Sequence, residues 1–245
     1  MMKISYGKHT KHKLMSRDER LLGYLPDTQY FTEETLREML EKHSQVILKP
    51  CFGYQGIGVA QLSALEDEQI ELHKENKKII LNGKTETIAY LNENHFRRKK
   101  PRYIVQQKIP LATINNNPFD LRVMVQRKRN SSEWVVTGKL AKIASNNYVI
   151  TNVAKALLGA EEAINRASLP SEKMNNILAE IDQVSLLVAE QLAKSYPKNR
   201  VYGIDLGIDQ EGKVWIIEAN LSPSTFMFKL LKDGSYETIR SFQRG

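Results

Sequence analysis

Three oxygen-bearing side chains in the C-terminal part of the sequence are candidate ligands for a metal ion. Asp205, Glu218 and Asn220 fall within residues 201–220, where two apolar runs are separated by the turn-forming residues 209–212. This pattern predicts a β-hairpin. Carboxylate and amide oxygens are hard ligands that suit Mg²⁺ when it also binds substrate phosphates. One face of this hairpin is therefore a candidate metal site, and the alternative is a surface hairpin with scattered acids.

The relative positions of these side chains depend on the register of the hairpin. With residues 209–212 as the loop, Asp205 lies opposite Ile216, and Glu218 is its diagonal neighbour on the same face, about 7–8 Å away. Period two places Asn220 on that face as well. A three-residue loop would instead separate Asp205 from Glu218. The opposite face is predicted to be apolar core and consists of Ile204, Leu206, Ile208, Trp215 and Ile217.

A second candidate site lies where the short apolar strand 46–50 meets a glycine-rich loop. Lys49 lies at the strand end, and a further strand rather than a helix follows the loop, so this is not a P-loop. Backbone N–H groups of such a loop can close over phosphates, although an ordinary hairpin with turn glycines is an equal alternative. Lys49 favours phosphate. The loop residues concerned are Gly53, Gln55, Gly56 and Gly58.

A cationic side chain is predicted on a central strand. Residues 119–126 alternate, with apolar residues facing the core and Asp120 and Arg122 facing the other way. Burying an arginine there is costly unless it binds an anion, so we interpret Arg122 as a site residue held by Asp120. A structural Asp–Arg pair is the alternative. Residues 134–144 are predicted to form the partner strand, which carries Lys142.

Helices and turns are expected to position these residues. Thr32 is a predicted N-cap, and the longest helix is predicted from Ser171 to about Ser195 with an apolar stripe facing the core. Asn82-Gly83 predicts a tight hairpin turn. The last residues are expected to be a short irregular or helical tail. The helix that follows Thr32 is expected to bury Leu36, Met39 and Leu40.

Composition limits the possible classes of protein. The 245 residues are 41% hydrophobic and 26% charged, which is ordinary for a soluble globular protein. Neither an 18-residue apolar run nor a signal peptide is recognisable, and Cys51 is the only cysteine, so no membrane partner and a cytoplasmic location are expected. The net charge of +8 suits anionic partners, but a nucleic-acid binder would have only this charge in its favour, because interleaved aromatic residues are lacking.

Taken in order, these signals resemble the ATP-grasp superfamily. The sequence is most similar to the endospore-coat-associated YheC/YheD branch of this superfamily, from about residue 10 to about residue 230. The segments that carry this similarity are YLPDT, LKPCFGYQGIGV, YIVQQKIPL, FDLRVMVQ, VTGKLAKIA and GIDLGID. The ordered series consists of Lys49 with the glycine-rich loop, the strand exit Gln106–Ile109, Asp120-x-Arg122, Lys142 before Thr151-Asn152, and Asp205 followed by Glu218-x-Asn220.

The resemblance implies an α+β fold in which two lobes clasp a nucleotide. Residues 26–105 would form the small lobe with its glycine-rich flap, residues 106–230 the large lobe with the metal site, and residues 231–245 a tail. The N-terminal lobe that usually precedes the grasp is expected to be absent or vestigial, because the chain begins almost at the first lysine. A partner protein is a candidate to replace it.

The resemblance also implies roles for individual residues. Lys11 (or Lys13 as second choice) and Lys49 correspond to the two lysines that meet the α- and β-phosphates. The hinge that binds adenine through its backbone corresponds to Gln106, Gln107, Lys108 and Ile109. The positions around the transferred phosphate correspond to Arg122, Lys142 and Asn152. The ligands of Mg²⁺, for which Mn²⁺ is a substitute, correspond to Asp205, Glu218 and Asn220.

The implied activity is that of an ATP-dependent carboxylate–amine ligase. In the chemistry of the superfamily, a carboxylate attacks the γ-phosphate, ADP leaves, and an amine displaces phosphate from the acyl phosphate. The sequence does not specify the acid and the amine, which include peptide- or protein-borne candidates. A kinase on the same fold and a non-catalytic nucleotide-binding protein of the spore coat are the alternatives, and the latter would be spore-associated.

Overall fold

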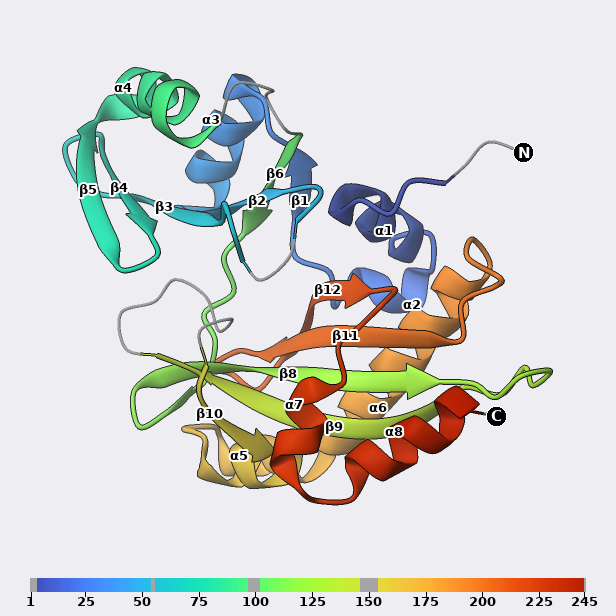
Figure 1. The fold of residues 1–245 in the computed structure, drawn as a ribbon. Coiled ribbons are helices and arrows are strands. Elements are labelled where there is room, and N and C mark those ends of the chain that lie inside the picture. The colour runs from blue at the N-terminus through green and yellow to red at the C-terminus, as the bar shows by residue number, and fades with distance from the viewer. Residues whose placement is uncertain (1–3, 54–55, 97–101, 146–153, 245) are drawn as a thin grey trace.

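The computed structural model describes residues 4–53, 56–96, 102–145 and 154–244. They form two lobes, each built on an antiparallel sheet with helices packed against it (Figure 1). The predicted α+β fold with two lobes is therefore confirmed. Within the described ranges, no helix combines the length and apolar character that a membrane span requires.

The small lobe contains a six-stranded sheet with the order β1-β6-β2-β3-β4-β5. Two helices and a π-helical turn contribute to its own apolar core cluster. The strands are β1 (Thr28–Tyr30), β2 (Gln45–Pro50), β3 (Ala60–Ala64), β4 (Gln69–Lys74), β5 (Lys77–Asn82) and β6 (Tyr103–Gln107). The helical segments are α3 (Glu33–His43), α4 (Gly83–Tyr90) and η1 (Leu91–His95).

Helix α3 begins where its sequence predicts. The Thr32 hydroxyl accepts a hydrogen bond from the Thr35 N–H at 3.0 Å, and the Thr35 hydroxyl accepts one from the Thr32 N–H at 2.8 Å. This reciprocal capping satisfies donors that have no partner within the helix. The predicted core face is also confirmed, because it buries Leu36, Met39 and Leu40.

The hairpin turn predicted at Asn82-Gly83 is wrong. Strand β5 ends at Asn82, and α4 begins at Gly83, which has a φ of +82°. The hairpin that joins β4 to β5 instead turns one strand earlier, at residues 75 and 76. The carboxylate of Glu86 accepts a hydrogen bond from the Asn82 N–H at 2.6 Å, so a side chain of the new helix satisfies the backbone donor at its N-cap.

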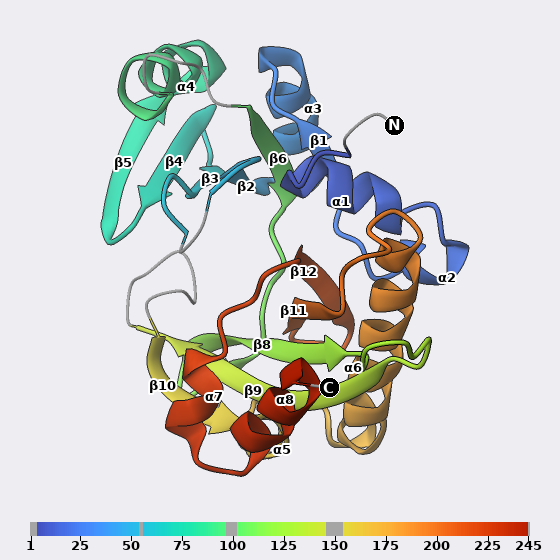
Figure 2. The same ribbon diagram turned by 45° about the vertical axis from the view of Figure 1, so that its right-hand side comes forward.

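The large lobe contains the strand order β10-β9-β8-β11-β12, with β7 pairing at the edge of β8. Helices α5 and α6 cover one face, and α7 and α8 lie on the other (Figures 1 and 2). The strands are β7 (Thr113–Ile114), β8 (Asn117–Gln126), β9 (Val135–Ala144), β10 (Ala154–Gly159), β11 (Val201–Ile208) and β12 (Val214–Asn220). The helices are α5 (Ala160–Arg166), α6 (Ser171–Ala193), α7 (Phe226–Leu231) and α8 (Ser235–Arg244).

The main core of the large lobe joins the N-terminal helices to the longest helix of the chain. The predicted long helix is confirmed as α6, and its buried stripe consists of Ile177, Ile181, Val184, Val188 and Leu192. The N-terminal helices α1 (Lys8–Met15) and α2 (Glu19–Leu22) add Leu14, Met15 and Leu21 to the same cluster. Helix α1 therefore packs on the large lobe although the small lobe follows it in the chain.

The C-terminal residues are an integral part of the large lobe rather than a peripheral tail. Phe228 of α7 and Ile239 of α8 are fully buried and form a second apolar cluster with Met124 of β8 and Leu140 of β9. Met124 lies on the face of β8 opposite to the main core, so α7 and α8 cover that face. The sequence pattern of these short helices is too brief to predict this burial.

This packing predicts different effects for two neighbouring phenylalanines. Phe228→Ala removes a fully buried ring and should lower the free energy of unfolding by about 3–5 kcal/mol. Phe226→Ala is the matched control, because its ring is 62% exposed and its loss should change stability by only about 0.5 kcal/mol or less. Urea unfolding of the two variants measures the difference. Equal stabilities would contradict an integrated C-terminus.

Candidate nucleotide and metal site

The metal-ligand candidates lie at one end of the β11–β12 hairpin. Asp205 pairs directly with Glu218, and Asn220 pairs with Gly203, so all three candidates come together. The Asn220 amide donates a hydrogen bond to Asp205 at 3.1 Å, which leaves the amide oxygen as the hard ligand atom of Asn220. The predicted clustering of these residues is therefore present, in a different register.

The register differs because the loop is longer than predicted. Ile208 pairs with Val214, and the Asp209 carboxylate accepts hydrogen bonds from the Lys213 N–H at 2.9 Å and the Trp215 indole at 2.8 Å. The register then shifts by one residue at a bulge between Asp205 and Leu206, which places Glu218 opposite Asp205. The predicted core face was wrong for Trp215 and Ile217, which are only half-buried. The buried residues of β12 are Val214, Ile216 and Ala219.

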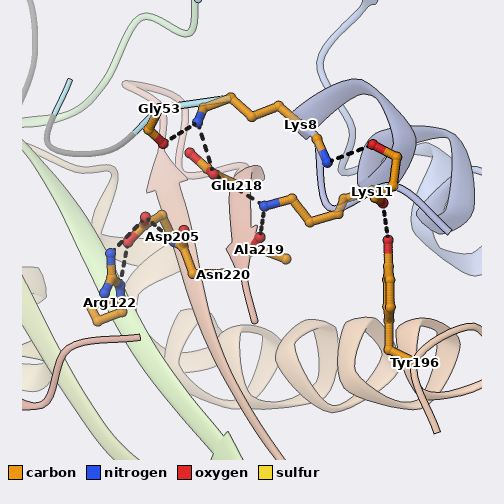
Figure 3. Close-up of polar contacts among 11 residues, drawn as sticks. Lys8, Lys11, Gly53, Arg122, Tyr196, Asp205, Glu218, Ala219 and Asn220 are labelled. Atoms are coloured by element: carbon orange, nitrogen blue, oxygen red, sulfur yellow. Dashed lines mark hydrogen bonds and ion pairs between the residues drawn. The ribbon is translucent and has the colours of Figure 1, made fainter. Parts of the chain in front are cut away.

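Arg122 of β8 forms a two-point ion pair with Asp205 of the neighbouring strand β11. Its Nε and Nη2 donate to the two carboxylate oxygens at 2.6 and 2.9 Å (Figure 3). The prediction that Asp120 holds Arg122 is therefore wrong, because Asp120 lies 2.9 Å from the Nζ of Lys142, its cross-strand partner on β9. The same lysine lies 3.5 Å from Asp205.

These buried ion pairs control the protonation of Asp205. Burial alone would raise the pKa of its carboxyl, but Arg122 and Lys142 outweigh burial and lower the pKa to about 2. Burial likewise acts to lower the pKa of Lys142, but Asp120 and Asp205 outweigh it and the pKa is raised. Both groups are therefore charged at neutral pH, as phosphate and metal binding would require.

Lysines from α1 approach Glu218 from the other side (Figure 3). Lys11 lies 3.3 Å from Glu218 and donates to the Ala219 carbonyl at 2.5 Å, while Lys13 is exposed. Of the two lysines proposed from the sequence, the structure therefore brings Lys11 to this site. Burial lowers the pKa of Lys11, and the adjacent carboxylate opposes this effect.

Lys8 is a site residue that the sequence analysis missed. Its Nζ lies 3.2 Å from the Glu218 carboxylate and donates to the Gly53 carbonyl at 3.2 Å (Figure 3). The available signal was the i, i+3 spacing of Lys8 and Lys11, which places both on one face of a helix. The basic segment around them was not predicted to be helical, so this signal was not used.

Lys49 and Gln106 extend the site into the small lobe. The Lys49 ammonium donates to the Gln106 side-chain oxygen at 2.5 Å, and the Gln106 amide donates to the Thr28 hydroxyl at 2.9 Å. Burial lowers the pKa of Lys49 to about 8. Gln106 thus contributes a buried side chain as well as the backbone groups for which it was singled out.

The remaining hinge candidates follow β6 as the chain crosses to the large lobe. The N–H groups of Gln107 and Lys108 donate to the carbonyls of Asp27 and Gln45 at 2.8 and 3.2 Å. Ile109 follows and accepts a hydrogen bond at its carbonyl from the Leu111 N–H at 3.0 Å. A base that binds to this hinge would therefore find the N–H groups of Gln107 and Lys108 already engaged.

In the glycine-rich loop, Gly56 and Gly58 have φ values of +71° and +78°, a region that favours glycine. A Cβ at Gly58 would also lie 3.0 Å from the Tyr103 hydroxyl. Both glycines thus have backbone reasons for their identity, which an ordinary turn would also explain. Gln55 of this loop and Asn152, the third residue proposed around the transferred phosphate, lie outside the described residues.

A narrow cavity separates the two lobes at this site. Its lining includes Lys8, Lys11, Lys49, Gln106, Ile217 and Glu218. The described residues contain no group of three or more His, Cys, Asp or Glu side chains that could hold a metal by themselves. Two carboxylates and one amide oxygen nevertheless fit Mg²⁺ that completes its shell with phosphate and water oxygens.

Cations outnumber acids across the candidate site as a whole. Five positive side chains, Lys8, Lys11, Lys49, Arg122 and Lys142, face the three carboxylates of Asp120, Asp205 and Glu218. The excess of positive charge favours a polyanionic ligand. The acids are paired with cations of the protein itself. A metal that bound the acids and a polyanion that bound the cations would therefore have to break these ion pairs.

A family model described as YheC/D-like ATP-grasp matches residues 3–242. The chain belongs to this family. The prediction of the YheC/YheD-like branch of the ATP-grasp superfamily is therefore confirmed, and it was made from the order of motifs rather than from any single one.

This YheC/D-like chain is also similar to individual proteins of known sequence or structure. It is 25% identical over 235 residues to the endospore coat-associated protein YheD of Bacillus subtilis, covering 92% of this chain and 50% of YheD. The structure of D-alanyl-alanine synthetase A from Vibrio cholerae has a TM-score of 0.55 at 15% identity, covering 97% of this chain and 63% of that one. An N5-carboxyaminoimidazole synthase from Aspergillus clavatus, in complex with ADP and 5-aminoimidazole ribonucleotide, has a TM-score of 0.52 at 10% identity, covering 89% and 44%.

The lowered pKa of Lys49 predicts a pH dependence of nucleotide binding. The ammonium is charged below about pH 8 and loses its charge as the pH rises through this value, so the affinity for ADP should fall above about pH 8. Lys49→Arg stays charged over this range and should reduce the pH dependence. Calorimetric titrations with ADP measure both profiles. An identical loss of affinity in the wild type and in Lys49→Arg would exclude Lys49 as its source.

Proposed function

We propose that this chain is an ATP- and Mg²⁺-dependent carboxylate–amine ligase that acts through an acyl phosphate. The observation that carries the proposal is the meeting of lysines from both lobes with the Arg122–Asp205 pair around the Glu218 carboxylate. Such an arrangement suits the triphosphate of a nucleotide and a metal that binds to it. The ADP complex of the Aspergillus clavatus relative and the synthetase name of the Vibrio cholerae relative support this proposal.

The proposed roles follow the resemblance to the ATP-grasp family. Lys11 and Lys49 bind the α- and β-phosphates, with the glycine-rich loop above them and the hinge from Gln106 to Ile109 around the base. Arg122 and Lys142 neutralise the phosphate that is transferred, together with Asn152. Asp205, Glu218 and Asn220 hold Mg²⁺, or Mn²⁺ in its place. The metal supplies charge neutralisation at the phosphates.

In the proposed reaction, an oxygen of the substrate carboxylate attacks the γ-phosphorus, and the bond to the ADP oxygen breaks. The amine then attacks the acyl carbon, and inorganic phosphate leaves. This route uses no side-chain nucleophile, so the chain contributes positioning and charge stabilisation. The acid and the amine are proposed to be small or peptide-borne, and the protein is proposed to work in the cytoplasm or at the spore.

The name of YheD supports a second candidate function. An endospore coat-associated relative is compatible with a nucleotide-binding protein that assembles without catalysis. The ion pairs that already neutralise all three carboxylates of the site are compatible with this candidate as well. ADP release separates the two functions, because a non-catalytic protein would bind the nucleotide and leave it intact.

Trapping with hydroxylamine tests the ligase chemistry. With ATP, Mg²⁺ and a panel of amino acids and short peptides as acids, hydroxylamine should replace the amine and yield a hydroxamate together with ADP. A stable phosphorylated product without hydroxamate would identify a kinase. If the protein binds the nucleotide but releases no ADP from ATP with any acid of the panel, the coat-assembly function is favoured.

The metal assignment predicts the effect of a single charge removal. Glu218→Gln keeps the size of the side chain but removes a carboxylate, so turnover should fall about a hundredfold or more while the fold persists. Glu211→Gln is the matched control, because Glu211 is exposed in the loop of the same hairpin. ADP release and circular dichroism measure activity and folding. Wild-type turnover in Glu218→Gln would exclude Glu218 as a metal ligand.

A further inference from the structure

Two ammonium groups share one oxygen of Glu218. Lys8 lies 3.2 Å and Lys11 3.3 Å from its Oε1, and both come from one face of α1 (Figure 3). One carboxylate cannot neutralise two cations, so the pair retains a net positive charge. A divalent metal that approached this oxygen would be repelled by both ammonium groups, and it could bind well only if one of them moved away.

The two lysines are held very differently. Lys11 is 5% exposed and is anchored by its short hydrogen bond to the Ala219 carbonyl on the same strand as Glu218. Lys8 is less buried, and its second acceptor is the carbonyl of Gly53 at the start of the glycine-rich loop. Separating Lys8 from Glu218 therefore costs less free energy than separating Lys11 from it.

The backbone around Lys8 is held by hydrogen bonds to both lobes. The Lys8 N–H donates to the Cys51 carbonyl of the small lobe at 2.9 Å, and the Tyr196 hydroxyl of the large lobe donates to the Ser5 carbonyl at 2.7 Å. Both lobes thus hold the N-terminal segment in place. Lys8 lines the narrow cavity between the lobes, so its side chain can change partner there without movement of this anchored backbone.

Resting on the function proposed above, we propose that Lys8 is a counter-ion of Glu218 that the metal displaces. In the empty site Lys8 neutralises the carboxylate. When the divalent cation binds Glu218 together with a nucleotide, the Lys8 ammonium transfers to a phosphate oxygen. Lys8 then weakens binding of the metal alone and strengthens binding of the metal–nucleotide complex. As a result, the metal and the nucleotide bind together more readily than either binds by itself.

This role predicts opposite effects of one substitution. Lys8→Met should bind Mn²⁺ alone more tightly, by about fivefold, because a competing cation is gone. The same variant should bind ADP with Mg²⁺ more weakly, by about fivefold, because a phosphate partner is lost. Mn²⁺ binding is measured from the electron paramagnetic resonance signal of the free ion, and ADP binding by calorimetry. Neither measurement depends on catalysis.

Two further variants serve as controls. Lys13→Met removes an exposed lysine of the same helix and should leave both affinities unchanged. Lys8→Arg keeps the charge and should therefore show smaller changes in both affinities than Lys8→Met does. Lys8→Gln repeats the test should Lys8→Met fail to fold by circular dichroism. Weaker binding of both ligands in the Lys8 variants would indicate a merely structural role and would overturn the proposal.

The outcome separates this proposal from the assignment of the metal site. If Glu218→Gln abolishes Mn²⁺ binding but Lys8→Met leaves it unchanged, Glu218 is a metal ligand and the role of Lys8 is wrong. If the wild type and Glu218→Gln bind Mn²⁺ equally, the metal assignment fails, and the proposal for Lys8 fails with it. Tighter Mn²⁺ binding combined with weaker ADP binding in Lys8→Met is the supporting result.

Discussion

Pairing of buried opposite charges is the constraint on which the site depends. A carboxylate removed from water without a counter-charge costs several kcal/mol, so each acid at this end of the large sheet needs a cation beside it. Lys142 of β9 faces Asp120 of β8, Arg122 of β8 faces Asp205 of β11, and Lys11 of α1 faces Glu218. The charges thus alternate across the sheet and continue into α1, which gives the N-terminal helix an electrostatic reason for its place.

The alternation depends on the register of the β11–β12 hairpin. Without the bulge after Asp205, the pairing of Ile208 with Val214 would place Glu218 opposite Ile204 and therefore toward the apolar core. The bulge turns Glu218 outward and leaves Ala219 as the buried residue. A local irregularity of one residue therefore decides whether Glu218 belongs to the site.

Features that depend on local patterns could be predicted from the sequence, and features that depend on distant contacts could not. The N-cap at Thr32 and the apolar stripe of α6 are local, and both predictions are confirmed. The partner of Arg122 was mistaken because Asp120 is near in sequence, whereas Asp205 becomes a neighbour only through strand pairing. The family was recognisable because the order of several weak motifs is far more specific than any one of them.

The same limitation explains the other errors of the site. The i, i+3 spacing of Lys8 and Lys11 places both on one helix face, but their shared partner Glu218 is set by the approach of α1 to β12 in space. The loop length of the hairpin depends on hydrogen bonds of the Asp209 carboxylate, and turn-forming composition alone does not determine them. Residue types at the site were therefore easier to predict than the partners of each residue.

The inclusion in the main core of residues as distant in the chain as Leu14 and Ala219 has a consequence for the order of folding. The small lobe is continuous between α2 and β8 and has its own apolar core, so it can fold as soon as it leaves the ribosome. The large-lobe core contains Leu14 from α1 and Ala219 from β12, so it is incomplete until Ala219 has been synthesised. During that interval Leu14 and Met15 of α1 lack the packing that α6 and β12 later provide, so the first helix of the chain is among the last elements to be completed.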